Sequence, residues 1–279
     1  MNNSKIVRNI KNILYLILKL VFIIIYISPL YLLFMIAVKT PEEFKTNMYS
    51  FPKKFAIDNF ITAINDSNYF NLFKNSFIIT ILSVILLVIV ATLAAYPISR
   101  IKNRFYTSLN FFFLAGLMVP IQMIMLPLYK IMIVTNLINK YWGLILINVG
   151  GAIPFAVFLI GGFLKTIPVE IEEAAFIDGA NKIQTFRLII LPLAKPGILT
   201  LTILQSIFFW NDFLLPLIFL KTTERQTIMV GIYNFVGEYV TQWNYIFALV
   251  AITIIPIIIL YLVFQRHIVE GIVAGSIKE

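Results

Sequence analysis

The sequence predicts an all-α polytopic transmembrane helical bundle of six spans. Of its 279 residues 60% are apolar and only 13% are charged, and the mean hydropathy of +0.93 excludes an ordinary soluble domain. Six apolar runs are each long enough to cross a hydrocarbon layer of about 30 Å, which takes about 20 helical residues. Charged residues avoid these runs and cluster between them, as burial in lipid requires.

The six spans are expected at residues 12–38, 76–97, 109–133, 141–163, 197–220 and 245–264. Several contain a proline, which neighbouring helices make tolerable in a membrane bundle. We therefore expect kinks at Pro29, Pro120, Pro127, Pro154, Pro216 and Pro256.

Three segments follow from these spans. Residues 1–70 hold the first span and an extracytoplasmic segment, in which an amphipathic helix is expected around residues 58–74. Residues 71–265 hold the other five spans, with a long polar loop at 165–196. Residues 266–279 form a tail on the cytoplasmic side.

The orientation follows from the basic residues, which give the chain a net charge of +9. With the N-terminus in the cytoplasm, the inner segments hold more Lys and Arg than the outer ones, as the positive-inside rule requires. This predicts a multi-pass protein of the cytoplasmic membrane with both termini in the cytoplasm and with lipid, not nucleic acid, as its surroundings. It also places the loop at 165–196 in the cytoplasm.

Several kinds of chemistry lack the residues they need. The chain has no cysteine and one histidine, His267, so no metal site and no serine–histidine triad is expected. No glycine has another glycine five positions on, so no nucleotide-binding loop of the G-x-x-x-x-G-K-[ST] type exists. Any ATP and Mg²⁺ must therefore bind to another polypeptide.

The sequence of the loop at 165–196 predicts two short helices joined at a glycine. Pro168 suits a first turn, and acidic residues follow at the positive end of that helix. One shallow apolar face is expected from Ile167, Ile171, Ala174 and Ala175. Gly179 is a natural helix stop, and Asn181 with Gln184 forms a capping box for a second helix. That helix carries a stripe of Ile183, Phe186 and Ile190 and is expected to end at Pro192 and Pro196.

The loop contains E-A-A-F-I-D-G-A at residues 173–180, followed by L-P at 191–192. This pattern resembles the EAA loop of ABC-importer permeases, which docks on an ATPase. The resemblance implies the type I ABC-importer permease fold, with residues 71–265 as its core domain. It also implies an ATPase-coupling role for Glu172, Glu173, Ala174, Ala175, Asp178, Gly179, Ala180 and Pro192. On periodicity alone, an amphipathic hairpin resting on the lipid headgroups is an equal alternative.

Two further stretches resemble the carbohydrate-uptake branch of that family. They are W-N-D-F-L-L-P-L at 210–217 and Q-R-H-I-V-E-G-I-V-A-G-S-I-K at 265–278. In the branch the second stretch reaches toward the ATPase, and Gly271 and Gly275 would permit an irregular path there. Ser276 and Glu279 stand where the family more often has glycine or alanine. The resemblance implies a permease subunit of a sugar importer that is not itself an enzyme. The implied partners are an ATPase dimer, a second permease subunit and an extracytoplasmic solute-binding protein.

Polar residues inside the spans are candidates for the translocation path. Asp212 lies in the fifth span, where an unpaired carboxylate is costly. It either lines the path or pairs with an Asn or Tyr of a neighbouring span, and the sequence leaves both open. Asn211, Asn148 and Gln122 are further path candidates.

Two other functions remain as alternatives. One is an importer permease for another solute, such as a polyol, glycerol phosphate or an amino acid. The other is a secondary transporter or membrane enzyme, which would need more ionisable residues within its spans than Asp212.

Overall fold

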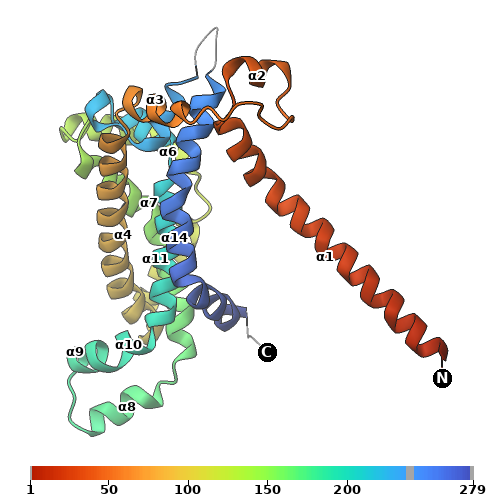
Figure 1. Cartoon of the computed structure of the whole chain (residues 1–279). Coiled ribbons are helices and arrows are strands. Elements are labelled where there is room, and N and C mark those ends of the chain that lie inside the picture. Colours follow the sequence, from red (N-terminus) through yellow and green to blue (C-terminus); the bar gives the residue numbers. More distant parts are fainter. Residues whose placement is uncertain (1, 237–241, 277–279) are drawn as a thin grey trace. The chain divides into compact units, whose positions relative to one another are not determined.

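The computed structural model describes the backbone of residues 2–236 and 242–276, and the side chains of residues 11–236 and 242–265. Every regular element in these ranges is a helix, in agreement with the predicted all-α class (Figure 1). In chain order the elements are α1 (Asn2–Ala37), α2 (Pro41–Thr46), α3 (Asp58–Asp66), α4 (Tyr69–Arg100), α5 (Arg104–Gly116), α6 (Ile121–Val134), α7 (Tyr141–Thr166), α8 (Glu170–Ile177), α9 (Lys182–Thr185), η1 (Phe186–Ile190), α10 (Leu191–Leu193), α11 (Lys195–Trp210), α12 (Leu214–Phe219), η2 (Thr223–Arg225), α13 (Ile228–Tyr233) and α14 (Trp243–Ser276).

Four described helices are long and apolar enough to cross a membrane: α1, α4, α7 and α14. Two bent helix pairs also qualify if each counts as one span, which brings the total to as many as six. The first pair is α5 with α6, and the second joins residues 182–193 to α11. The predicted spans at 76–97, 141–163 and 245–264 each fall within one long helix, and the span at 12–38 does so up to Ala37, where α1 ends.

Three predicted elements differ from the observed ones. The span at 109–133 is not continuous, because the chain breaks at residues 117–120 and α5 and α6 meet at 101°. Pro120 stands at this break as the N-cap of α6 and does not kink a helix. The span at 197–220 is helical only to Trp210 and resumes as the short α12. The amphipathic helix at 58–74 is divided at Ser67 and Asn68, where Asn68 has a φ of 51° and α4 begins directly afterwards.

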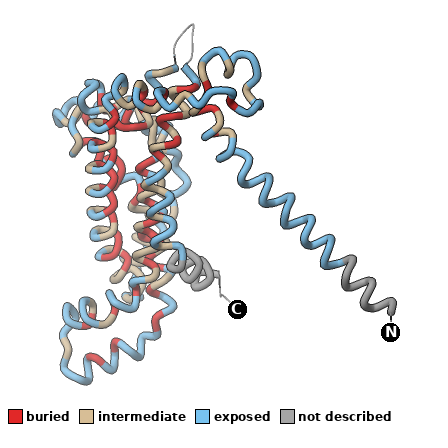
Figure 2. The backbone as a smooth tube through the Cα atoms, viewed as in Figure 1, coloured by how far each residue is buried: buried red, intermediate tan, exposed pale blue. Residues whose placement is uncertain are grey.

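The chain divides into two units, which we describe separately: residues 1–69 with 231–255, and residues 70–230 with 256–279. In the first unit Asn59 joins three segments. Its side-chain amide donates to the carbonyls of Ala37 and Lys39 at 2.8 Å each, and its oxygen accepts from Asn244 at 3.1 Å. The fully buried Lys39 ammonium donates to the carbonyls of Asn47 and Met48. These bonds order the segment that follows α1. Residues 11–30 of α1 itself are exposed throughout (Figure 2).

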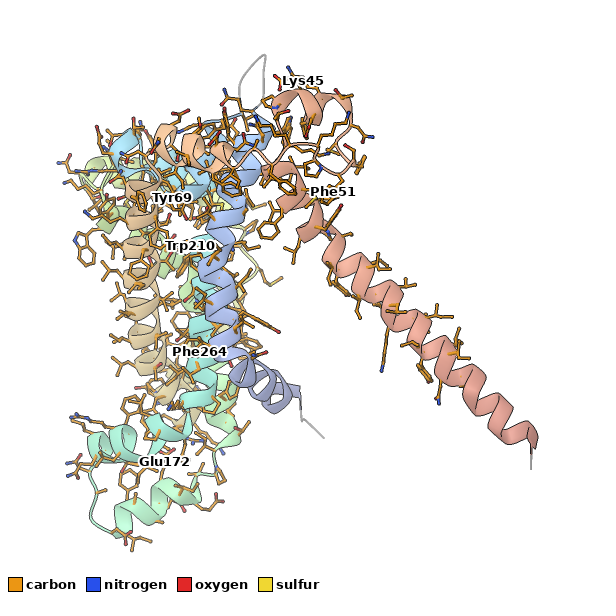
Figure 3. All side chains as sticks on the ribbon, viewed as in Figure 1. Lys45, Phe51, Tyr69, Glu172, Trp210 and Phe264 are labelled. Carbon is orange, nitrogen blue, oxygen red and sulfur yellow. The ribbon has the colours of Figure 1, made fainter. Side chains whose placement is uncertain are left out.

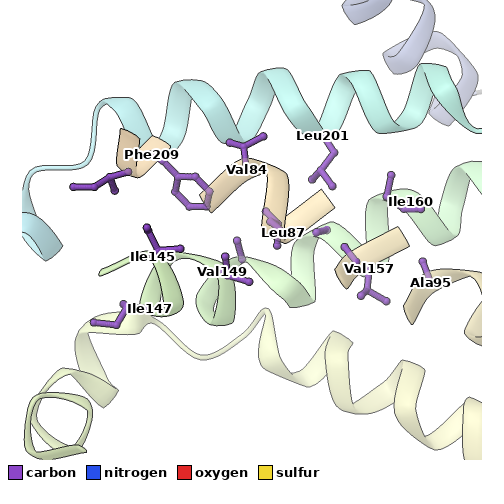
Figure 4. Close-up of a cluster of buried hydrophobic side chains, with 14 of the residues drawn as sticks. Val84, Leu87, Ala95, Ile145, Ile147, Val149, Val157, Ile160, Leu201 and Phe209 are labelled. Atoms are coloured by element: carbon purple, nitrogen blue, oxygen red, sulfur yellow. The ribbon is translucent and has the colours of Figure 1, made fainter. Parts of the chain in front are cut away.

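The core of the second unit lies between α4, α7 and α11 (Figure 4). Leu87 of α4, Ile145 and Ile160 of α7, and Leu201 of α11 are fully buried there. Small residues such as Ala91, Ala95 and Ala156 let the helices approach closely, which is how membrane helices gain packing contacts without a hydrophobic driving force. This packed bundle carries α8 and α9 at one end (Figure 1).

Candidate functional site

The first loop helix, α8, ends in a glycine motif as the sequence predicts. Gly179 has a φ of +87°, a left-handed conformation that side chains with a Cβ resist. The Ala180 amide donates to the Ala175 carbonyl at 2.9 Å, and the Gly179 amide donates to the Phe176 carbonyl at 3.1 Å. This pair of bonds is a Schellman motif, which satisfies the last carbonyls of the helix. Asp178 is the C-cap residue of the same turn.

The second half of the loop begins with the predicted capping box. The Asn181 side chain accepts from the amides of Ile183 and Gln184 at 3.0 Å, and the Gln184 side chain accepts from the Asn181 amide at 2.8 Å. The helix does not end at Pro192, because α9 continues through a π-helical turn, η1, into α10. The chain then bends by 66° before α11. Pro192 is the second residue of α10, directly after η1, and the helix ends one residue later at Leu193.

The predicted apolar faces of the loop are only partly correct. Ile167 and Ala175 are buried, but Ile171 and Ala174 are exposed, so the four residues do not share one buried face. Ile190 is fully buried and Phe186 is half-buried, whereas Ile183 is 76% exposed. The reason is that α8 turns an acidic residue, Glu172, toward the bundle in place of Ile171.

Glu172 is the best-anchored side chain of the loop (Figure 3). Its carboxylate pairs with the Arg100 guanidinium at 2.5 Å and accepts a hydrogen bond from the Tyr96 hydroxyl at 2.8 Å. Arg100 also donates to the carbonyl of Ile167 at 3.0 Å. The exposed fractions of the Arg100 and Glu172 side chains are only 10% and 7%. We call these three residues, Tyr96, Arg100 and Glu172, the α4–α8 brace, because they fix α8 to the last turn of α4.

The brace was not predicted from the sequence. Nothing in the local sequence distinguishes Arg100 from the other basic residues at the ends of the spans, or Tyr96 from the other aromatic residues. One signal was available: Glu172 is three residues before Ala175, so both lie on the same helical face. An acid on the buried face requires a partner, and the end of α4 supplies one.

The adjacent Glu173 faces the other way and is exposed, as are Ala174 and Asp178. Phe176 and Ile177 beside them are 43% and 87% exposed. The loop therefore has two sides, one braced to α4 and one on which an acid and apolar groups are exposed.

The two stems of the loop touch where they leave the bundle. Phe163 lies on α7 just before the loop, and Gly197 lies on α11 just after it. A Cβ placed on Gly197 would lie 2.5 Å from Cγ of the Phe163 ring, which is shorter than any real Cβ contact. Gly197 thus permits a close approach of the two stems, which fixes the spacing of the loop's ends.

The four path candidates occupy different surroundings. Asn148 is buried and donates to the Ser83 hydroxyl at 3.3 Å, which places it between α7 and α4. Gln122 and Asn211 are exposed, and the Asn211 amide donates to the Ile207 carbonyl. Asp212 follows the end of α11, and one of its carboxylate oxygens accepts from the Leu215 amide at 3.3 Å, as a cap of α12. Within the described residues no hydrogen bond joins any two of the four.

The tail residues Gly271 and Gly275 lie in the last turns of α14, which is helical through Ser276. The irregular path expected there is therefore absent up to that residue. In the part of the chain whose side chains are described, no group of three or more His, Cys, Asp or Glu residues could hold a metal ion.

The backbone at Gly179 gives a direct test of the loop's turn. No atom lies within 4 Å of a Cβ built there, so a substitution acts only through the positive φ. We expect Gly179→Val to destabilise the turn by roughly 1–2 kcal/mol and to lower the thermal stability of the protein. Gly179→Asn is the matched control, because asparagine adopts this conformation more readily than valine. Equal thermal stability of the two purified variants would show that the turn is unimportant.

Comparison with known proteins gives a consistent result. Residues 88–273 match the family model described as "Binding-protein-dependent transport system inner membrane component". The chain is 34% identical to a probable starch degradation products transport system permease protein of Thermoanaerobacterium thermosulfurigenes, over 94% of this chain and 95% of the relative. It is 36% identical to a multiple sugar-binding transport system permease protein of Streptococcus mutans, over 91% and 93% of the two chains.

Among solved structures, the fold is similar to a chain of a bacterial ABC transporter involved in the import of the acidic polysaccharide alginate. The TM-score is 0.79 at 21% identity, over 95% of this chain and 98% of the other. At that identity the likeness concerns the fold, and it agrees with the predicted type I ABC-importer permease architecture.

Proposed function

Because this chain belongs to the family of binding-protein-dependent transport system inner membrane components, we propose that it is the permease subunit of an ATP-driven importer of sugars. The observation that carries the proposal is the two-sided loop at 165–196. Its inner side is fixed to α4 by the Glu172–Arg100 pair, and its outer side presents Glu173 and Ile177. A loop of this kind can receive a displacement from a partner and pass it to the bundle.

In the proposed mechanism an ATPase dimer binds the outer side of the loop, including Ala174, Asp178 and Ala180. ATP and Mg²⁺ bind to that dimer, and this chain is not an enzyme. When the dimer closes, the loop moves as a body, since the Schellman turn and the capping box hold its two halves together. The α4–α8 brace and the contact of Gly197 with Phe163 pass the displacement to α4, α7 and α11. The work comes from the different affinity of the dimer for the two loop positions.

The proposed solute is a sugar or related carbohydrate. Relatives that match over more than nine-tenths of their length are described as permeases for starch degradation products and for multiple sugars. We propose that Asn211 and Gln122 line the path, since both are exposed. We propose the same for Asp212, because one of its carboxylate oxygens is buried with no hydrogen-bond partner among the described residues and could be satisfied by a solute. Asn148 would contribute only if α4 and α7 separate. A polyol, glycerol phosphate or amino acid remains the alternative solute.

The other proposed partners are a second permease subunit and an extracytoplasmic solute-binding protein. The family description names such a binding protein as the element on which transport depends. In this arrangement both termini and the loop face the cytoplasm, and the last turns of α14, with Gly271 and Gly275, extend toward the ATPase.

Uptake by the purified complex tests this proposal. The complex is isolated through a tag on this chain and reconstituted with ATP inside the vesicles. We expect an ATPase and a second permease to co-purify, and a labelled oligosaccharide to enter only with ATP and the binding protein present. In a second preparation, ATP is replaced by a non-hydrolysable analogue and a proton gradient is applied. Accumulation of the sugar under these conditions would establish a secondary transporter instead.

The orientation can be tested because the native chain has no cysteine. Single cysteines at the exposed positions Ile183 and Lys54 report the two sides. In intact spheroplasts we expect an impermeant thiol reagent to label Lys54→Cys and to spare Ile183→Cys until the membrane is opened. Labelling of Ile183→Cys from outside would place the loop away from any cytoplasmic ATPase.

A further inference from the structure

The second unit has an open groove of about 620 Å³ that the proposed coupling mechanism does not use. One wall comes from α4, with Val88, Ile89 and Leu93, and the opposite wall from α11, with Ile198 and Leu199. Phe186, Leu191 and Pro192 close the end where the loop returns to the bundle. This volume is in the range of small-ligand sites, about 300–1,000 Å³.

The groove is apolar along its walls and basic at one end. Arg187 and Lys195 are the charged residues that line it, and no acidic residue does. Both are exposed, and neither has an ion pair or hydrogen bond to another described residue. An occupant must therefore combine an apolar body with a negatively charged end.

The position of the groove along the helices matches one leaflet of a bilayer. At a rise of about 1.5 Å per residue, Val88 lies about 18 Å and Leu93 about 10 Å from Arg100, the end of α4. Lys195 begins α11, and Leu199 lies one turn deeper. Val88 and Leu93 are therefore about 8 Å apart along α4, which is about half of the depth of about 15 Å of one leaflet in a hydrocarbon layer of about 30 Å. The basic end lies where headgroups are found.

The local backbone defines where the groove lies. The π-helical turn η1 packs against α4 through Phe186 and Tyr96, whose ring centroids are 4.9 Å apart, and the chain then bends by 66° before α11. The groove lies beside this contact, between α4 and the start of α11. Arg187 lies in η1 and Lys195 at the first position of α11, on either side of the bend.

We propose that this groove binds an anionic phospholipid, with an acyl chain between α4 and α11 and the phosphate between Arg187 and Lys195. The lipid would link η1 and α10 to α4. The α4–α8 brace does not hold this part of the loop, because it joins only α8 to α4. Zwitterionic lipids would fill the groove less well, because their choline or ethanolamine group offsets the charge of the phosphate.

Native mass spectrometry of the complex tests the proposal, with phosphatidylglycerol and phosphatidylcholine supplied in equal amounts. We expect the wild-type complex to retain phosphatidylglycerol preferentially. Each basic group near the headgroup contributes about fivefold to that preference, so Arg187→Gln with Lys195→Gln should reduce it by about 25-fold. Lys182→Gln is the matched control, since Lys182 is a basic, exposed residue of the same loop that does not line the groove.

A photo-reactive residue in place of Leu199 identifies what touches the apolar wall in the assembled complex. We expect it to attach to lipid, and Leu93→Trp, which fills the groove without changing its charge, to suppress that adduct. An adduct with a helix of the second permease would overturn the proposal and assign the groove to a protein interface. A loss of about fivefold in the phosphatidylglycerol preference of the Lys182→Gln control, the same loss per charge as in the double variant, would also overturn it, because it would show only general charge attraction.

Discussion

Replacing Glu172 by alanine is expected to cause the largest loss of assembled protein of any single change in the loop. The substitution leaves the Arg100 guanidinium, whose side chain is 10% exposed, without its carboxylate partner. Removal of one member of a buried pair costs about 3–5 kcal/mol, because the remaining charge stays desolvated. We expect a several-fold fall in membrane abundance, measured by quantitative immunoblotting, together with reduced transport.

Two controls separate the brace from a general effect of charge. Glu173→Ala removes the neighbouring exposed acid and should leave the abundance unchanged. The double variant Arg100→Met with Glu172→Met removes both charges and should be more abundant than either single variant, since a buried pair can be replaced by apolar groups at little cost. If Glu172→Ala and Glu173→Ala lower the abundance equally, the brace has no special role.

A side chain at Gly197 is expected to separate the two stems of the loop. Its Cβ would meet three atoms of Phe163 at 2.5, 2.6 and 2.9 Å, so the ring or the helix must move. Overpacking of this kind costs about 1–3 kcal/mol, which outweighs the gain of about 1 kcal/mol in helix propensity from replacing glycine by alanine. We expect Gly197→Ala to lower the thermal stability of the complex and to uncouple ATP hydrolysis from uptake.

Gly162 provides the matched control on the partner helix. It lies next to Phe163 in α7, but nothing lies within 4 Å of a Cβ built on it. Gly162→Ala should therefore be neutral or slightly stabilising in the same thermal assay. Equal behaviour of the two alanine variants would mean that the contact between the stems is not required.

The parts of the fold that the sequence predicts well are those set by local rules. The Schellman turn at Gly179 and the capping box of Asn181 with Gln184 depend on residues within a few positions of one another. The four long helices follow from long apolar runs, because a helix satisfies the backbone hydrogen bonds of such a run within lipid.

The features that the sequence does not reveal depend on tertiary contacts. The residues at the break between α5 and α6, 117–120, are all apolar. Hydropathy alone therefore predicts one continuous span there. The apolar pattern predicts that Ile171, and not Glu172, lies on the buried side of α8, because a buried acid requires a partner. That partner, Arg100, is 72 positions away in the sequence, so local patterns do not reveal it. The bond between Asn148 and Ser83 likewise joins separate spans, so the sequence alone does not predict it.

We propose that an ATPase drives this chain through the outer side of α8. A photo-reactive residue in place of Ile177, which is 87% exposed on that side, tests this coupling in the purified complex. We expect a covalent adduct with the ATPase subunit, and a change in its yield when ATP is replaced by ADP. An adduct with lipid alone, in a complex that still takes up sugar at the normal rate, would contradict the claim and leave the loop as a hairpin on the membrane surface.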